Sequence, residues 1–208
     1  MPPRNDDPYF AGITLKNCKY YMELGNKLLN YNSNYPAEIN NKIKMLEFLN
    51  NYKNPFSRKL AIGHFTASAF LLNSDKTKFL LMHHNKLNKW IQLGGHCNGD
   101  SDVLAVAIKE AKEESGIEEI EPISTEIYDL DIHYIPERHQ ELAHYHYDVR
   151  FLLKTIDNDN FVKNDEASEL RWIEFSSYSL KDFSLEESVT RMIEKYQKMK
   201  SKIEQVNL

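Results

Sequence analysis

A glycine turn that leads through a polar loop into a helix, at residues 95–117, constrains the fold of this chain most. The segment reads GHCNGDSDVLAVAIKEAKEESGI, and Gly116 is the kind of residue expected just past a helix C-terminus. Residues 90–93, which precede the turn, have the composition of a short strand. A strand that passes directly into a helix indicates an α/β architecture.

The rest of the chain divides at a turn-rich stretch, residues 50–57. Before it, Ile39, Ile43, Leu46 and Leu49 recur at helical spacing on one face that must be buried. After it, strands are predicted at residues 64–73, 77–84, 123–133, 145–155 and 169–175, and a C-terminal helix at about 185–203. We therefore expect an N-terminal helical extension at residues 1–57. Residues 58–208 are expected to form a domain with a mixed sheet covered by helices on both faces.

Composition excludes several classes of protein. The 208 residues are 41% apolar and 27% charged, as in globular proteins. The longest apolar run, residues 103–108, is far shorter than the roughly 20 residues that cross a membrane, and no secretory signal is visible. Two cysteines, Cys18 and Cys97, are too few for a disulfide framework, so we expect a cytoplasmic protein without a membrane partner.

Acidic residues concentrate around the central helix. Residues 98–121 carry a net charge of −6, whereas the whole chain carries −5. Glu110, Glu113 and Glu114 stand at i, i+3 and i+4, which places three carboxylates on one face within a turn. Like charges at this spacing repel, so the pattern indicates either a site for a hard cation such as Mg2+ or Mn2+ or a solvated acidic face. In either case nucleic acid is not the expected partner.

The same segment resembles the signature of the Nudix hydrolases. The residues at matching places are Gly95, Glu110, Ala111, Glu113, Glu114, Gly116 and Ile117. Residues 90–95, WIQLGG, resemble the family's approach to this signature, and residues 169–173, ELRWI, resemble its closing strand. The resemblance therefore covers about residues 61–176.

This resemblance implies a Nudix-type α/β/α sandwich and a metal-dependent hydrolase. Its substrate would be a small nucleotide-type molecule, a nucleoside diphosphate linked to another group, cleaved at the diphosphate. Mg2+ or Mn2+ would be held by Glu110, Glu113 and Glu114 together with the carbonyl of Gly95, and Glu113 and Glu114 would be catalytic. Glu166, in the loop before the last strand, is our first choice for the general base; the alternative is an ordinary surface carboxylate.

Two positions depart from the family pattern. Lys109 stands where the family has arginine, and Ser101 stands where it has glutamate. We predict that Asp100, one residue out of register, pairs with Lys109 and so supports the site. Asp102 is expected to cap the helix.

A histidine-rich strand gives a second group of candidates. Residues 144–153 alternate, with His144, His146 and Arg150 on a polar face that would line the cleft. Together with His96, which follows the glycine pair, they are predicted to bind substrate through its phosphates. An additional metal site and a solvated strand face are the alternatives.

Two other functions are compatible with a Nudix fold. An enzyme similar to isopentenyl diphosphate isomerase needs a cysteine and a glutamate across a closed pocket, and Cys97 has no identifiable partner glutamate. A nucleotide-binding sensor usually lacks the carboxylates that are present here. The apolar face of the N-terminal helix is expected to be buried against the domain or in a homodimer.

Overall fold

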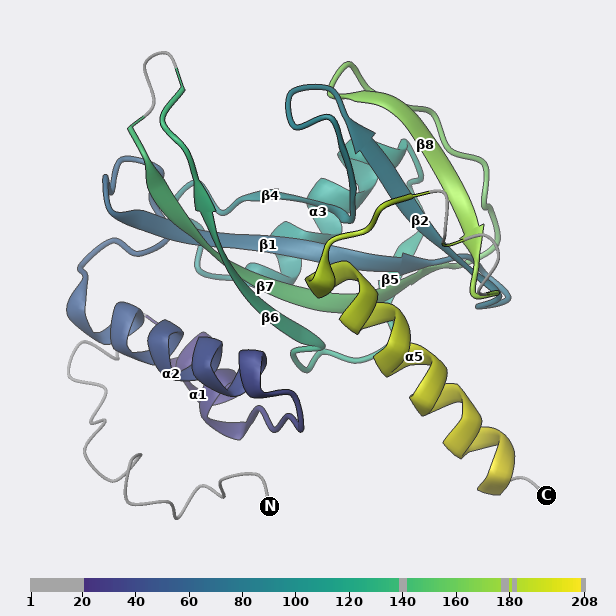
Figure 1. Ribbon diagram of the computed structural model, residues 1–208, viewed down its shortest axis with the longest axis horizontal. Helices are drawn as coiled ribbons and strands as arrows, with labels where there is room; N and C mark the ends of the chain where they lie inside the picture. The colour runs from purple at the N-terminus through teal and green to yellow at the C-terminus, as the bar shows by residue number, and fades with distance from the viewer. Residues whose placement is uncertain (1–20, 139–141, 177–179, 181–182, 207–208) are drawn as a thin grey trace. The chain divides into compact units, whose positions relative to one another are not determined.

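The computed structural model describes residues 21–138, 142–176, 180 and 183–206. It has an α/β fold with an eight-stranded mixed sheet, as the sequence predicted (Figure 1). Its elements are α1 (Met22–Asn30), α2 (Pro36–Asn51), β1 (Gly63–Leu72), β2 (Lys78–His84), β3 (Lys89–Ile91), β4 (Leu93–His96), α3 (Val103–Ser115), β5 (Ile120–Pro122), β6 (Asp129–Ile135), β7 (His144–Thr155), β8 (Ala167–Glu174) and α5 (Glu187–Val206). Within the described part of the chain, every helix is too short or too polar to cross a membrane.

These elements gather into two compact units. Unit 1 takes its described residues from Met1–Ser68, Gly94–Ala107 and Ser124–Phe151. Unit 2 takes them from Ala69–Leu93, Ile108–Ile123 and Leu152–Leu208. Strands β1, β4 and β7 and helix α3 contribute residues to both units.

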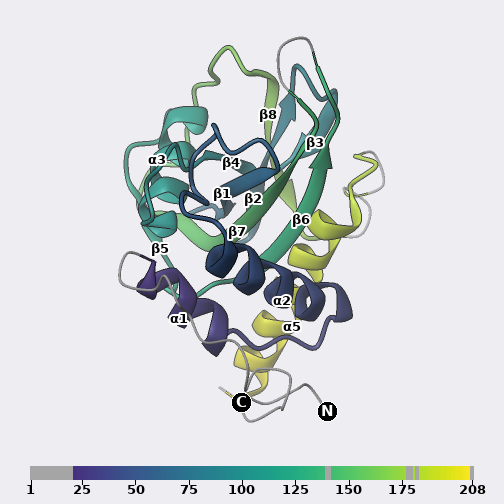
Figure 2. The same cartoon turned by 90° about the vertical axis from the view of Figure 1, so that its left-hand side faces the viewer.

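Unit 1 combines the N-terminal helices with part of the sheet. In it β6 and β7 pair antiparallel, from Asp129 opposite Arg150 to Ile135 opposite His144. Helices α1 and α2 lie side by side, and α2 packs against β6 (Figures 1 and 2). Phe48 of α2 stacks on Tyr147 of β7 with ring centroids 3.9 Å apart. The helical extension therefore shares a core with the strands, while the predicted boundary at residue 57 stays a prediction.

The buried face of α2 is more polar than the sequence suggested. Leu46 and Leu49 are buried as expected, but the face also carries Glu38 and Lys42. The Lys42 ammonium donates to the carbonyl of Tyr31 at 2.9 Å, just past the end of α1, and the Glu38 carboxylate accepts from the hydroxyl of Tyr31 at 2.6 Å. These polar side chains are stable inside unit 1 because the connection between the two helices supplies their partners.

Unit 2 is built on a long antiparallel ladder between β2 and β8. It runs from Lys78 opposite Glu174 to His84 opposite Ala167. Helix α5 packs through Tyr196, whose ring stacks on Phe175 at 4.7 Å and whose hydroxyl donates to the carbonyl of Lys76 at 3.1 Å. The strands and the terminal helix thus share the core of this unit.

The ends of α3 follow the sequence prediction. The carboxylate of Asp102 accepts a hydrogen bond from the N–H of Ala105 at 3.0 Å, which caps the helix at its start. Gly116 follows the last helical residue with φ +69°, and a Cβ there would lie 2.8 Å from the carbonyl oxygen of Val162. Only glycine meets both requirements without strain, so the end of the helix is fixed.

Candidate functional site

Helix α3 presents three carboxylates within one turn, and they differ in exposure. Glu114 is buried, whereas the side chains of Glu110 and Glu113 are 16% and 56% exposed. Burial raises the pKa of Glu110; Lys109 opposes this shift, and the charges of Glu113 and Glu166 add to it. A carboxylate whose charged form is disfavoured in this way gains from a bound cation. The donor set therefore fits a hard divalent metal ion.

Glu166 ends the loop that leads into β8. Its carbonyl accepts a hydrogen bond from the N–H of Asn85 at 2.9 Å, and its own N–H donates to the side-chain oxygen of Asn164 at 3.0 Å. The side chain is exposed, and its charge helps to raise the pKa of Glu110. Glu166 is thus within electrostatic reach of α3, and its role as general base stays a prediction.

Lys109 has partners other than the one we expected. Its ammonium group donates to Glu113 at 2.8 Å and to Glu110 at 3.3 Å. The Asp100 carboxylate instead accepts from the N–H of Asp102 at 2.9 Å. Because Asp100 belongs to unit 1 and Lys109 to unit 2, the Asp100–Lys109 pair stays a prediction. A carboxylate one helical turn away lies beside the lysine on the helix surface, whereas Asp100 bonds within its own loop.

Gly95 lies on β4 directly after a glycine that the fold requires. A Cβ at Gly94, where φ is +154°, would lie 2.3 Å from the hydroxyl oxygen of Ser68. Gly95 belongs to unit 1, whereas Glu110, Glu113 and Glu114 belong to unit 2. Its expected contribution of a carbonyl ligand stays a prediction.

Five histidines gather in unit 1. His64 lies on β1, His96 on β4, His133 on β6, and His144 and His146 on β7. The ring of His146 lies between 4.9 and 5.3 Å from the other four, measured between centroids. Burial, reinforced by nearby basic groups, lowers the pKa of His146 to about 2 and that of His96 to about 4. The structure thus brings together the three histidines predicted to bind substrate and holds at least two of them neutral at pH 7.

Arg150, the fourth predicted substrate contact, is engaged by an internal ion-pair network. Its Nε donates to Asp148 at 2.7 Å, and its two terminal nitrogens donate to Asp129 at 3.3 Å and to Asp131 at 3.2 Å. The side chain is only 3% exposed. Because each nitrogen of the guanidinium group already meets a carboxylate, the geometry assigns Arg150 to pairing within unit 1.

The sequence interpretation missed His64, Asp129 and Asp131. A signal for the two aspartates was present, because β6 reads Asp-x-Asp-x-His and β7 reads His-x-Asp-x-Arg. The antiparallel register places Arg150 opposite Asp129 at one end of these patterns and His146 opposite His133 at the other. His64 carried no such signal, since a single histidine at a strand start is uninformative without the fold.

A comparison with protein-family models agrees with the resemblance in the sequence. A family model described as NUDIX domain matches residues 63–195. No curated protein matches the chain. Similar solved structures include a C. elegans Ap4A hydrolase (16% identity, 66% of this chain and 97% of that chain, TM-score 0.48) and a Nudix hydrolase from M. smegmatis (16%, 68% and 88%, 0.49). A NUDIX-family hydrolase from Clostridium perfringens is another (24%, 65% and 97%, 0.46).

Proposed function

Because the chain belongs to the Nudix family, whose model covers more than half of it, we propose that this Nudix-type diphosphohydrolase uses Mg2+ or Mn2+ to cleave a nucleoside diphosphate linked to another group. The observation that supports the proposal is the set of three carboxylates on one turn of α3, where Glu110 is disfavoured as an anion. A small nucleotide-type molecule is the substrate class that the family supports.

The roles of the residues follow from their chemistry. Glu110, Glu113 and Glu114 would hold the metal, which when bound polarises phosphoryl oxygens and makes the attacking water more acidic. Glu166 would accept the proton of that water as its oxygen attacks one phosphorus of the diphosphate. The bond between this phosphorus and the bridging oxygen breaks, and the second phosphate leaves with the oxygen.

Substitution of a buried ligand tests this assignment. With a panel of nucleoside diphosphate derivatives and Mg2+, Glu114→Gln should lower kcat/KM by more than about 100-fold, since ligand placement is costly to disturb. The matched control is Glu118→Gln, an exposed carboxylate just past the same helix, which should change kcat/KM by less than about twofold. A Glu114→Gln protein that keeps most of its turnover at saturating Mg2+ would refute the proposal.

The same panel separates the other functions. A sensor would bind a nucleotide without turnover. An isomerase would act on an isoprenoid diphosphate and would need a reactive cysteine. Cys97 is buried instead, with an exposed fraction of 3%.

We propose further that residues 1–57 support the hydrolase domain, residues 58–208, rather than carry chemistry. Sedimentation of the intact chain would show whether it forms the homodimer expected from the sequence.

A further inference from the structure

We propose that His64, His144 and His146 bind one divalent transition-metal ion, of which Zn2+ is the representative, through their imidazole nitrogens. This site lies within unit 1 and shares no residue with the carboxylates of α3. It goes beyond the proposed hydrolysis and does not depend on it.

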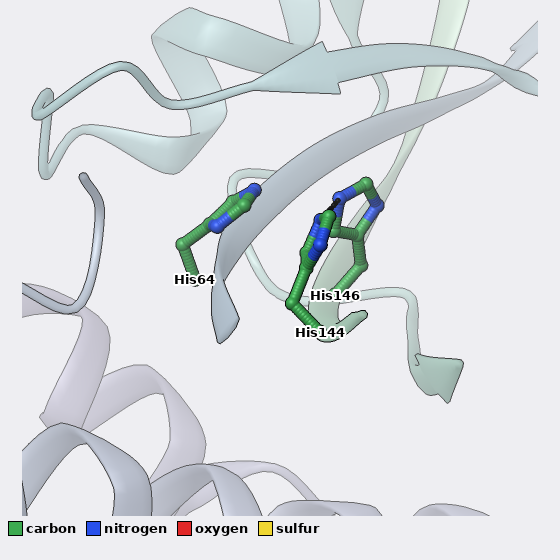
Figure 3. A group of neighbouring side chains, drawn as sticks. All are labelled: His64, His144 and His146. Atoms are coloured by element: carbon green, nitrogen blue, oxygen red, sulfur yellow. Dashed lines mark hydrogen bonds between the residues drawn. The ribbon is translucent and has the colours of Figure 1, made fainter. Parts of the chain in front are cut away.

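The three side chains converge from two strands. One ring nitrogen from each lies within 4.8 Å of the other two, and Figure 3 shows the rings facing one another. The Nε2 atoms of His144 and His146 are 3.1 Å apart. Two nitrogens that share a tetrahedral zinc ion at about 2.0–2.1 Å lie roughly 3.3 Å apart. The His144–His146 pair already has nearly this spacing, and a ring nitrogen of His64 lies within 4.8 Å of both partners.

A hydrogen bond fixes the form of His144. Its Nδ1 lies 2.7 Å from the carbonyl oxygen of Leu142, which can only accept, so Nδ1 carries the proton. In the neutral ring Nε2 then has a free lone pair, and this is the atom that faces His146. Metal-binding histidines are commonly oriented in this way, by a carbonyl on the nitrogen that does not bind the metal.

The chemistry of the cluster favours a transition metal over the two other ligands it could attract. Neutral imidazole nitrogens suit Zn2+, Ni2+ or Cu2+, whereas Mg2+ prefers oxygen. A phosphate needs N–H donors, whereas the N–H of His144 is already donated to the carbonyl oxygen of Leu142 and the nitrogen that faces His146 can only accept. The ring of His96 lies beside the cluster, with its centroid 5.1 Å from that of His64 and 5.0 Å from that of His146.

Metal binding can be measured without activity. The full chain is stripped with a chelator and titrated with Zn2+ in excess Mg2+ by calorimetry, and Co2+ is added to a second sample to record its absorption spectrum. We expect one Zn2+ per chain and the intense visible bands of tetrahedral Co2+. His144→Ala and His146→Ala should each weaken Zn2+ binding by more than about 100-fold, because removal of a ligand costs more than removal of its outer partner.

Two matched variants locate the ion. His83→Ala removes a histidine of unit 2 that contacts Ser168, and Glu114→Gln removes a carboxylate of α3; both should leave Zn2+ affinity within about twofold. If a histidine variant does not fold, X-ray absorption of the zinc-loaded wild type must show at least three imidazole ligands. The proposal is overturned by the absence of Zn2+ binding in excess Mg2+, by binding lost in Glu114→Gln but not in the histidine variants, or by an oxygen-only ligand shell.

Discussion

Replacing Arg150 by methionine removes the cation on which three aspartates converge. Asp129 and Asp148 are almost completely buried, and the Asp131 side chain is 17% exposed. Asp148 would keep the hydrogen bonds from the hydroxyls of Thr66, at 2.9 Å, and Ser68, at 2.7 Å. Asp129 and Asp131 would lose their contacts with the guanidinium group, so carboxylate charge would be left inside unit 1 without its cation.

The expected loss of stability is large. Removing one partner of a buried ion pair costs about 3–5 kcal/mol because the other charge stays buried. For a chain of this length each kcal/mol lowers Tm by roughly 2–4 °C, so Arg150→Met should melt about 6–20 °C below the wild type. At pH 5 the deficit should be smaller than at pH 7.5, since a stranded carboxylate can be neutralised by a proton.

Urea unfolding followed by circular dichroism at both pH values measures this effect. The control is Arg171→Met, which removes an arginine whose ion pair with Glu169 is about half exposed. Exposed pairs are worth about 1 kcal/mol or less, so this variant should unfold near the wild type. If Arg150→Met were as stable as Arg171→Met at pH 7.5, the network would not be a buried electrostatic unit and the reasoning would be wrong.

Two further variants test unit 1. Phe48→Ala should lower the free energy of unfolding by about 3–5 kcal/mol, because its ring is buried on Tyr147; an unchanged urea midpoint for the whole domain would show that the N-terminal helices fold separately. His146 has a pKa lowered to about 2 from the ordinary 6.5, so its unfolded form takes up a proton first and stability is lost as pH falls below about 6.5. Between pH 7 and pH 5, in EDTA, the free energy of unfolding of the wild type should therefore fall by up to about 2 kcal/mol more than that of His146→Gln, since one pKa unit corresponds to about 1.36 kcal/mol. If urea unfolding shows equal losses for the two proteins, burial is not the cause of the lowered pKa.

Helix α3 was predictable because its determinants are local. Asp102 as the cap, Gly116 as the stop and the spacing of the three glutamates all act within one turn of chain, and the structure has the helix as expected. The division of the β7 side chains between two faces was equally predictable, since successive side chains of a strand point to opposite faces. In each case a short-range rule is enough to predict the element.

What the sequence could not predict has one physical cause: the residues concerned have partners that are distant in the sequence. Arg150 was predicted to bind the substrate because an arginine on a polar strand face can bind phosphate. It cannot do so when carboxylates on the neighbouring strand already occupy its guanidinium group. Asp129 and Asp131 are some 20 residues away in sequence, and only the pairing of β6 with β7 makes them neighbours. The burial of Glu38 had no signal in the sequence either, because its partner Tyr31 reaches it only when α1 and α2 pack.

The ion-pair network and the contact between His133 and His146 depend on the same strand register. On β7 the residues His146, Asp148 and Arg150 follow at intervals of two, and β6 sets His133, Asp131 and Asp129 opposite them in that order. A slip of one residue on β6 would turn His133, Asp131 and Asp129 to the other face, and the His133–His146 contact and the ion pairs would be lost together. A register that separated Arg150 from the aspartates of β6 would leave buried charge uncompensated, at a cost of about 3–5 kcal/mol. The register that pairs Arg150 with Asp129 is therefore also the one in which the imidazoles of His133 and His146 meet.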